Sequence, residues 1–213
     1  DTARLSRLGI TILERGWLSS NNVLLQGRDS TALVDSGYCT HAGQTVALVQ
    51  EVLQTRPLDV LVNTHLHSDH CGGNAALQSV FPQLKTLIPP GQAKAVAEWD
   101  PVALTHEPTG QNCPSFRFDG VLAPGDLVQL GDFGWEVHAA KGHDPHSVVL
   151  FEPTSRVLIS ADALTDPQTK PRAIIAQTTK GKGVDFMEGK AEWHHKVPSA
   201  EQYEAALSQL GKQ

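Results

Sequence analysis

One histidine-rich run constrains this chain more than any other feature: residues 64–73 read THLHSDHCGG. Three imidazoles and one carboxylate fall directly after the apolar run Val60–Val62. Neutral imidazole and carboxylate are ligands that Zn²⁺ or a similar borderline cation prefers. A strand that ends in a loop can aim such side chains at one ion, and His65 and His67 on a strand would share a face. The run therefore predicts a catalytic metal site at the end of a strand.

Composition is that of one ordinary domain. The 213 residues are 40% hydrophobic and 19% charged, which is enough to bury a sizeable core. The formal net charge of -6 argues against non-specific binding to nucleic acid, which depends on a basic surface. We expect a small-molecule substrate as the partner, with no nucleic acid and no membrane. The sequence does not predict the oligomeric state.

The number and spacing of the cysteines indicate the redox state of the cellular compartment. Cys39, Cys71 and Cys113 are an odd number without paired spacing, so a disulfide framework is not expected and a reducing, cytoplasmic location is favoured. No apolar run reaches eighteen residues, and no charged-then-apolar leader is present. We therefore expect neither a membrane span nor a retained signal peptide.

Hydrophobic periodicity predicts a mixed α/β (α+β) chain, in which two strand-rich segments flank a helical stretch. Strands are expected at 8–13, 22–25, 31–34, 59–64 and 85–88, and again at 116–122, 126–130, 135–140, 148–151 and 157–160. Helices are expected at 73–80 and 92–99, and around the apolar positions 46, 49, 52 and 53. Thr40 is a suitable N-cap for the helix around positions 46–53, and Arg56-Pro57 ends that helix.

Two further clusters follow predicted strands in the later half of the chain. The first, residues 141–147, carries His143, Asp144 and His146, and the second, residues 160–164, carries Asp162. A carboxylate at the end of a buried strand could reach the same metal from a different direction. Six side chains are thus candidate metal ligands: His65, His67, Asp69, His70, His143 and Asp162.

Other polar residues near these clusters have plainer interpretations. Asp144 precedes a proline and suits a turn, and His146 suits a polar loop residue better than a substrate-side group. Cys71 suits a small buried filler better than a group that tunes the metal loop. His106 and His138 are interpreted as non-ligands.

The three clusters together resemble the metallo-β-lactamase superfamily over about residues 8–165. The resemblance implies an αββα sandwich with the metals at one edge, between two sheets. It implies that His65, His67 and His143 hold the first metal, that Asp69 and His70 belong to the second, and that Asp162 bridges them. The sequence is most similar to the hydrolase branch that includes glyoxalase II-like thioesterases.

The implied chemistry is hydrolysis. One Zn²⁺ held by three histidines leaves a position for water, whose pKa falls from about 15.7 towards 7 and yields a hydroxide nucleophile. Asp69 is expected to be the catalytic residue that orients this hydroxide and accepts its proton. The predicted substrates are thioesters, esters, lactones or amides, and the mixed donor set leaves iron or manganese open as alternatives to zinc.

The chain departs from that resemblance after Leu164. Residues 166–213, and above all 180–184 and 193–198, resemble the end of a transketolase N-terminal, thiamine-diphosphate-binding region, so the chain looks chimeric. We expect a metal-binding domain over 1–165, whose sandwich is incomplete, and a tail over 166–213 that is not an independent domain. The tail is expected to contain a strand at 173–179 and a helix in which Ser199 and Gln202 form a capping box.

This departure also removes the last histidine that completes the second metal site in the superfamily. We therefore expect one firmly bound Zn²⁺, a weak or absent second ion and reduced activity. The alternative is that His194 or His195 supplies the missing ligand. Two other functions stay open: a non-catalytic metal-binding protein and, with the tail as its sole support, a transketolase component.

Overall fold

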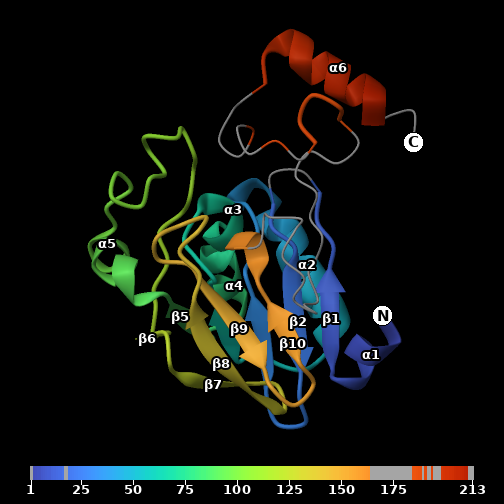
Figure 1. Ribbon diagram of the computed structural model, residues 1–213, viewed down its shortest axis with the longest axis vertical. Helices are drawn as coiled ribbons and strands as arrows, with labels where there is room; N and C mark the ends of the chain where they lie inside the picture. The colour runs from blue at the N-terminus through green and yellow to red at the C-terminus, as the bar shows by residue number, and fades with distance from the viewer. Residues whose placement is uncertain are drawn as a thin grey trace. The chain divides into compact units, whose positions relative to one another are not determined.

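The computed structural model describes residues 2–16, 19–163, 184–188, 190, 193 and 198–210 (Figure 1). The chain divides into two compact units, Asp1–Ala176 and Gln177–Gln213. The predicted strand at 173–179 and both His194 and His195 lie outside the described residues. The predicted boundary between residues 165 and 166 stays a prediction.

A six-stranded sheet forms the centre of the first unit, in the order β1-β2-β3-β4-β5-β6. Its strands are β1 Ile10–Leu13, β2 Asn22–Gln26, β3 Thr31–Val34, β4 Val60–Val62, β5 Lys85–Ile88 and β6 Gly120–Val121. β1, β2 and β3 form an antiparallel meander, whereas β3 to β6 run parallel to one another. Parallel neighbours require crossover connections, and each of the three here contains a helix.

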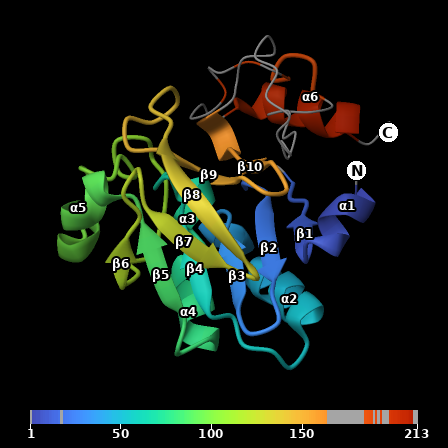
Figure 2. The ribbon, with the colours of Figure 1, turned by 60° about the horizontal axis from the view of Figure 1, so that its bottom comes forward.

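The described helices of the first unit lie in these connections, except α1, which precedes β1. They are α1 Thr2–Arg7, α2 Ala42–Leu53, α3 Ser68–Cys71, α4 Asn74–Val80 and α5 Ala93–Glu98, with short 3₁₀ turns η1 Cys39–His41 and η2 Pro90–Gln92. α2 joins β3 to β4, and α3 and α4 join β4 to β5. Figure 2 shows α2 and α4 on one side of the six-stranded sheet and the second sheet on the other.

The second sheet is antiparallel throughout, in the order β10-β9-β8-β7. Its strands are β7 Leu127–Leu130, β8 Phe133–Ala139, β9 Val148–Glu152 and β10 Val157–Ile159, and the turn η3 Ala161–Ala163 follows. From β6 to residue 163 the chain contains no α-helix. This stretch therefore contributes no helix to the second helical layer of an αββα sandwich, and the prediction that the sandwich is incomplete concerns residues after 164 and stays a prediction.

Two hydrophobic clusters hold the layers together. Between the sheets, Val34, Val62 and Trp135 are almost fully buried, and between the first sheet and its helices Leu33 and Val49 are fully buried. Every residue of β3 is buried, because this strand is covered on both faces. Truncation of a buried tryptophan such as Trp135 typically destabilises a domain by about 3–5 kcal/mol.

The strand predicted at 59–64 ends at Val62, so His65 and His67 lie beyond it rather than on it. The strand ends there because the backbone N–H of Thr64 donates to the carboxylate of Asp35 at 2.9 Å instead of to a neighbouring strand. The prediction of Thr40 as a helix cap was also wrong. Thr40 lies inside η1, and α2 begins after His41 without a side-chain cap.

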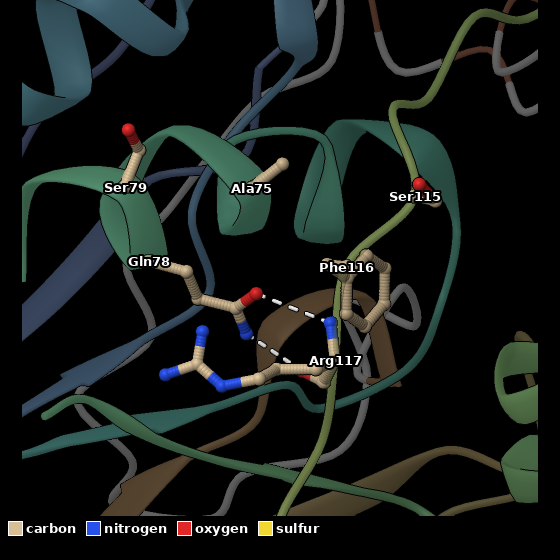
Figure 3. A pocket seen from close by; sticks show the side chains of 6 residues that line it. All are labelled: Ala75, Gln78, Ser79, Ser115, Phe116 and Arg117. Atoms are coloured by element: carbon tan, nitrogen blue, oxygen red, sulfur yellow. Dashed lines mark hydrogen bonds between the residues drawn. The ribbon is translucent and has the colours of Figure 1, made fainter. Parts of the chain in front are cut away.

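The strand predicted at 116–122 is reduced to Gly120–Val121, and the amide of Gln78 accounts for the difference. Its Nε2 donates to the Arg117 carbonyl at 2.6 Å, and its Oε1 accepts from the Arg117 N–H at 3.1 Å (Figure 3). A side chain thus occupies the backbone groups that strand pairing would use. Gln78 and Arg117 border an open depression with Ala75, Ser79, Ser115 and Phe116.

In the second unit, α6 Ala200–Leu210 begins with the predicted capping box. The Ser199 N–H donates to Gln202 Oε1 at 2.9 Å, and the Gln202 N–H donates to Ser199 Oγ at 3.3 Å. Val184, Met187 and Trp193 form a small buried cluster in the same unit. Within the described residues, no helix combines the length and the apolar character needed to cross a bilayer.

Candidate metal centre

The histidine-rich run forms a loop and the single helical turn α3, both pressed against the end of β3. The Ser36 N–H donates to the His70 carbonyl at 2.7 Å. The glycine pair Gly72-Gly73 allows this approach, because a Cβ at Gly72 would lie 2.5 Å from the Cys39 nitrogen and one at Gly73 would clash with the Ser36 carbonyl. Any larger residue here would push the loop away from the sheet.

Three imidazoles converge at the mouth of this loop. His65 Nε2 lies 3.1 Å from His67 Nδ1, and His143 Nε2, from the loop between β8 and β9, lies 3.0 Å from the same atom. Two nitrogens bound to one tetrahedral zinc at its usual bond length are separated by about 3.3 Å. The three rings therefore have the spacing of a shared cation site.

A second group of donors lies beside the first. Asp162 Oδ2, from η3, is 3.4 Å from His70 Nε2 and 3.5 Å from His143 Nε2, so it faces both groups. Asp69 Oδ2 is 3.7 Å from His70 Nε2. That nitrogen is buried and has no hydrogen-bond partner among the described residues, although it faces the two carboxylates. A cation between them would satisfy it.

Asp35 supports the site from behind and was not among the predicted residues. Its Oδ2 accepts from His70 Nδ1 at 2.8 Å and from the Thr64 hydroxyl at 2.8 Å. This contact fixes His70 with Nε2 directed towards Asp69 and Asp162, which is how outer carboxylates orient metal-binding histidines. The sequence signal was present: Asp35 directly follows β3, the parallel neighbour of the strand that precedes the histidines.

The pKa values of His65 and His70, the two fully buried histidines of the site, are shifted in opposite directions. Burial lowers the pKa of His65 well below its usual range, and the imidazoles of His70 and His67 lower it further. Burial also lowers the pKa of His70, but the carboxylates of Asp35, Asp69 and Asp162 raise it by more, so this pKa lies well above its usual range. These surroundings therefore favour the neutral form of His65 and the positively charged form of His70.

The neighbouring polar residues have distinct surroundings. Asp144 Oδ1 accepts from the His146 N–H at 2.7 Å, as suits a turn, while its Oδ2 lies 3.7 Å from His67 Nε2. His146 packs against Gly91. His138 is exposed and contacts Glu136 at 3.0 Å. Asp144 is therefore close enough to orient His67, a contact that the turn interpretation missed.

The donor set fits a divalent cation of borderline softness. Ligand atoms of His65, His67 and His143 lie within 4.8 Å of one another, as do those of His65, His70 and Asp162, and Asp69 lies beside this second group. The donors come from three loops that follow three different strands. The buried His70 Nε2, which faces the carboxylates of Asp162 and Asp69 without a hydrogen bond to either, is the structural observation that such an ion would account for.

Comparison with known proteins gives two kinds of match. A subunit of apulose-4-phosphate transketolase from Actinobacillus succinogenes is 45% identical over 80 residues, which are 37% of this chain and 25% of that protein. The chain thus spans about a quarter of the length of such relatives. Human acyl-coenzyme A thioesterase MBLAC2 is 26% identical over 183 residues, covering 73% of this chain and 63% of that protein.

Solved structures and a family profile complete the comparison. A metallo-β-lactamase from Cronobacter sakazakii superposes with a TM-score of 0.58 at 19% identity, covering 71% of this chain and 61% of that one. The profile described as the metallo-beta-lactamase superfamily matches residues 15–207 and so extends into the transketolase-like tail. By this match, and with a partial resemblance to transketolase subunits beside it, the chain belongs to the metallo-β-lactamase superfamily.

Proposed function

We propose that this protein is a metal-dependent hydrolase that cleaves a thioester, ester, lactone or amide. One observation carries the proposal: donors from residues 65–70, 143 and 162 converge with ligand-like spacing, and the buried His70 Nε2 lacks a hydrogen-bond partner among the described residues. Membership of a superfamily of metal-dependent hydrolases supports the same reaction class.

In this proposal each residue of the centre has a defined role. His65, His67 and His143 hold the first cation, Asp69 and His70 contribute to a second, and Asp162 faces both. When bound, such a cation supplies Lewis acidity that activates water and polarises a carbonyl. Asp69, about a fifth exposed, orients the attacking water and accepts its proton. Asp35 keeps His70 in place through its Nδ1–H.

A thioester is the substrate class we favour, because a relative that covers most of this chain is named an acyl-coenzyme A thioesterase. We propose zinc as the metal, firmly bound at the three-histidine group and weakly or not at all at the other, with iron or manganese as alternatives. Among residues 2–16 and 19–163, His70 and Asp162 share their group with His65, which the first cation would already occupy, and Asp69 lies beside them. This short ligand set favours reduced activity.

The same short set supports a second candidate, a metal-binding protein without turnover. The transketolase matches cover only about a quarter of those proteins and leave thiamine-dependent chemistry as the least supported alternative. A cytoplasmic location and a tail boundary at residue 166 also remain parts of the proposal.

The test measures metal content and thioester hydrolysis together in wild type, His67→Ala, His195→Ala and His138→Ala. We expect at least one metal per chain and measurable turnover in wild type. In His67→Ala we expect the affinity for the metal and the rate of turnover each to fall by about 100-fold. His138→Ala is the matched control, because the His138 ring is exposed and contacts Glu136 on the surface of β8. It should behave as wild type.

Three results separate the candidates. Two metals per chain with turnover, both reduced in His195→Ala, mean that the tail completes the second group. One metal with turnover that is insensitive to His195→Ala means a mononuclear hydrolase. Stoichiometric metal with no turnover on thioester, ester, lactone or amide substrates contradicts the hydrolase proposal and favours the non-catalytic one.

A further inference from the structure

A second cluster of side chains that could hold a metal ion includes the last residue of α3. Cys71, the last residue of α3, meets His106 and Cys113, which belong to the long connection between α5 and β6. One ligand atom from each of the three residues lies within 4.8 Å of the other two. We call this trio the thiol cluster. None of its members belongs to the six candidate ligands described above.

The spacing of the two sulfurs is that of a metal site. Cys71 Sγ and Cys113 Sγ are 3.8 Å apart, and all three cysteines of the chain are free. Two thiolates on one tetrahedral zinc, with Zn–S bonds of about 2.3 Å, are separated by about 3.8 Å. A disulfide would need the sulfurs at about 2.05 Å. The observed separation therefore suits two ligands of one cation.

His106 adds an independent observation. This side chain is only 3% exposed, and its Nε2 lies 3.0 Å from the Leu66 carbonyl. A carbonyl can only accept, so this nitrogen carries the hydrogen and Nδ1 carries the lone pair. Nδ1 is buried and has no hydrogen-bond partner in the described part of the chain. Histidines that bind metals commonly donate their other N–H to a backbone carbonyl in this way.

The surroundings of the thiol cluster suit a dehydrated, soft site. Cys71 and Cys113 pack with Leu66, Ile88 and Phe116 in one hydrophobic cluster. A neutral imidazole buried here without a partner for its lone pair is unfavourable, because the acceptor has lost its hydrogen bond to water. A cation bound by two thiolates and this imidazole removes that penalty, and carries little net charge into the apolar surroundings.

We propose that Cys71, His106 and Cys113 form a second cation site for Zn²⁺, separate from the histidine and aspartate centre. Such a site has a structural consequence. It would cross-link α3 to the connection that carries residues 106 and 113, in a region where the Ser68 hydroxyl already donates to Gln111 Oε1 at 2.8 Å. The connection would then be fixed against the loop that bears His65 and His67.

Cobalt substitution tests this proposal without reference to activity. Co²⁺ bound to thiolates absorbs strongly in the near ultraviolet by charge transfer from sulfur, and Co²⁺ held only by imidazole and carboxylate does not. Reduced protein titrated with Co²⁺ should gain this absorption, and added Zn²⁺ should remove it. The band should persist in His67→Ala, so failure of the hydrolase proposal and failure of this one are distinguishable.

Variants of the thiol cluster give the opposing result. Cys113→Ser should abolish the band, and His106→Gln, which keeps a donor for the Leu66 carbonyl, should weaken Co²⁺ binding by about tenfold. Cys39→Ser is the matched control, because Cys39 is also free but does not belong to the cluster of ligand atoms that Cys71, His106 and Cys113 form. Any of three results would overturn the proposal. The first is the absence of a thiolate band in wild type, and the second is an equal loss of the band in Cys39→Ser. The third is a Cys71–Cys113 disulfide that persists in the presence of reductant.

Discussion

Two donor clusters share the single helical turn α3, and they differ in chemistry and in support. His70 belongs to a centre of nitrogen and oxygen donors whose members follow strands of both sheets. Cys71, the next residue, belongs to a cluster of sulfur and nitrogen donors whose partners lie in a connection with little regular structure. Candidate donors at strand ends are positioned by the packed sheets, whereas the positions of His106 and Cys113 depend on local contacts.

The largest effect on metal affinity and on stability is expected from a substitution of Asp35, which lies where the histidine and aspartate centre meets the six-stranded sheet. Asp35→Asn removes the charge that orients His70 and leaves a protonatable imidazole buried beside a neutral amide. We expect metal affinity at the second group to fall by about 10- to 100-fold and the free energy of unfolding of the metal-free protein to fall by about 3 kcal/mol. Chelator competition and urea unfolding measure the two quantities.

Asp59→Asn is the matched control for that variant. Asp59 accepts from the Thr31 N–H at 2.8 Å at the opposite end of β3, so its loss should weaken the fold without changing metal affinity. The thiol cluster should keep its Co²⁺ band in both variants. Equal loss of metal affinity in Asp59→Asn would mean that the sheet as a whole, rather than Asp35, sets the geometry of the centre.

The contrast between the two clusters also accounts for what the sequence could predict. His65, His67 and His70 were predicted as ligands because three imidazoles rarely crowd into one short run outside a metal site, and the superfamily and the sandwich are confirmed. The residues that face the first centre come from strand ends, and strand ends are visible in hydrophobic periodicity. The assignment of those residues as ligands stays a prediction.

The position of Asp35 at the end of a strand was visible in the sequence, but its long-range contact and that of Cys71 were not. Asp35 reaches His70 across 35 positions, and Cys71 meets Cys113 across 42. No local periodicity records such a meeting, because it depends on how α3 packs against β3 and on the path of an irregular connection. For the same reason Gln78 could not be foreseen as the group that replaces strand pairing at Arg117.

The connection between α5 and β6, which contains Arg117, provides the next test. Gln78→Leu keeps the approximate volume of a buried side chain but leaves the N–H and the carbonyl of Arg117 without these partners. We expect the free energy of unfolding to fall by about 1–3 kcal/mol and Co²⁺ binding at the thiol cluster to weaken several-fold. Metal binding at the histidine centre should be unchanged, because its donors do not depend on residues 115–117.

Gln50→Leu serves as the control, since Gln50 lies on the exposed face of α2. It should alter the free energy of unfolding by no more than about 0.5 kcal/mol. Weaker metal binding at the histidine centre in Gln78→Leu would contradict the separation of the two clusters, and would show that the connection supports both.

The smallest effect is expected at the turn between β9 and β10, which precedes Asp162. Glu152 accepts from the Thr154 N–H at 2.9 Å and the Ser155 N–H at 2.5 Å. Burial raises the pKa of Glu152, and these hydrogen bonds from Ser155 and Thr154 lower it by more, so the pKa lies below its usual value. A depressed pKa means that the charged carboxylate stabilises the folded state more than the unfolded state.

The sign of the pH dependence follows from that shift. The contribution of Glu152 is fully present above the pKa of the unfolded chain, about 4.3, and is lost as the pH falls through the lower pKa of the folded state. Glu152→Gln should therefore lower the free energy of unfolding by about 1 kcal/mol at pH 7, and the difference from wild type should shrink in acid. Urea unfolding of the metal-free proteins at pH 7 and near pH 3 measures it. A difference that grows in acid would contradict the assignment, while an unchanged metal affinity would confirm that the position of Asp162 depends on the sheet rather than on this turn.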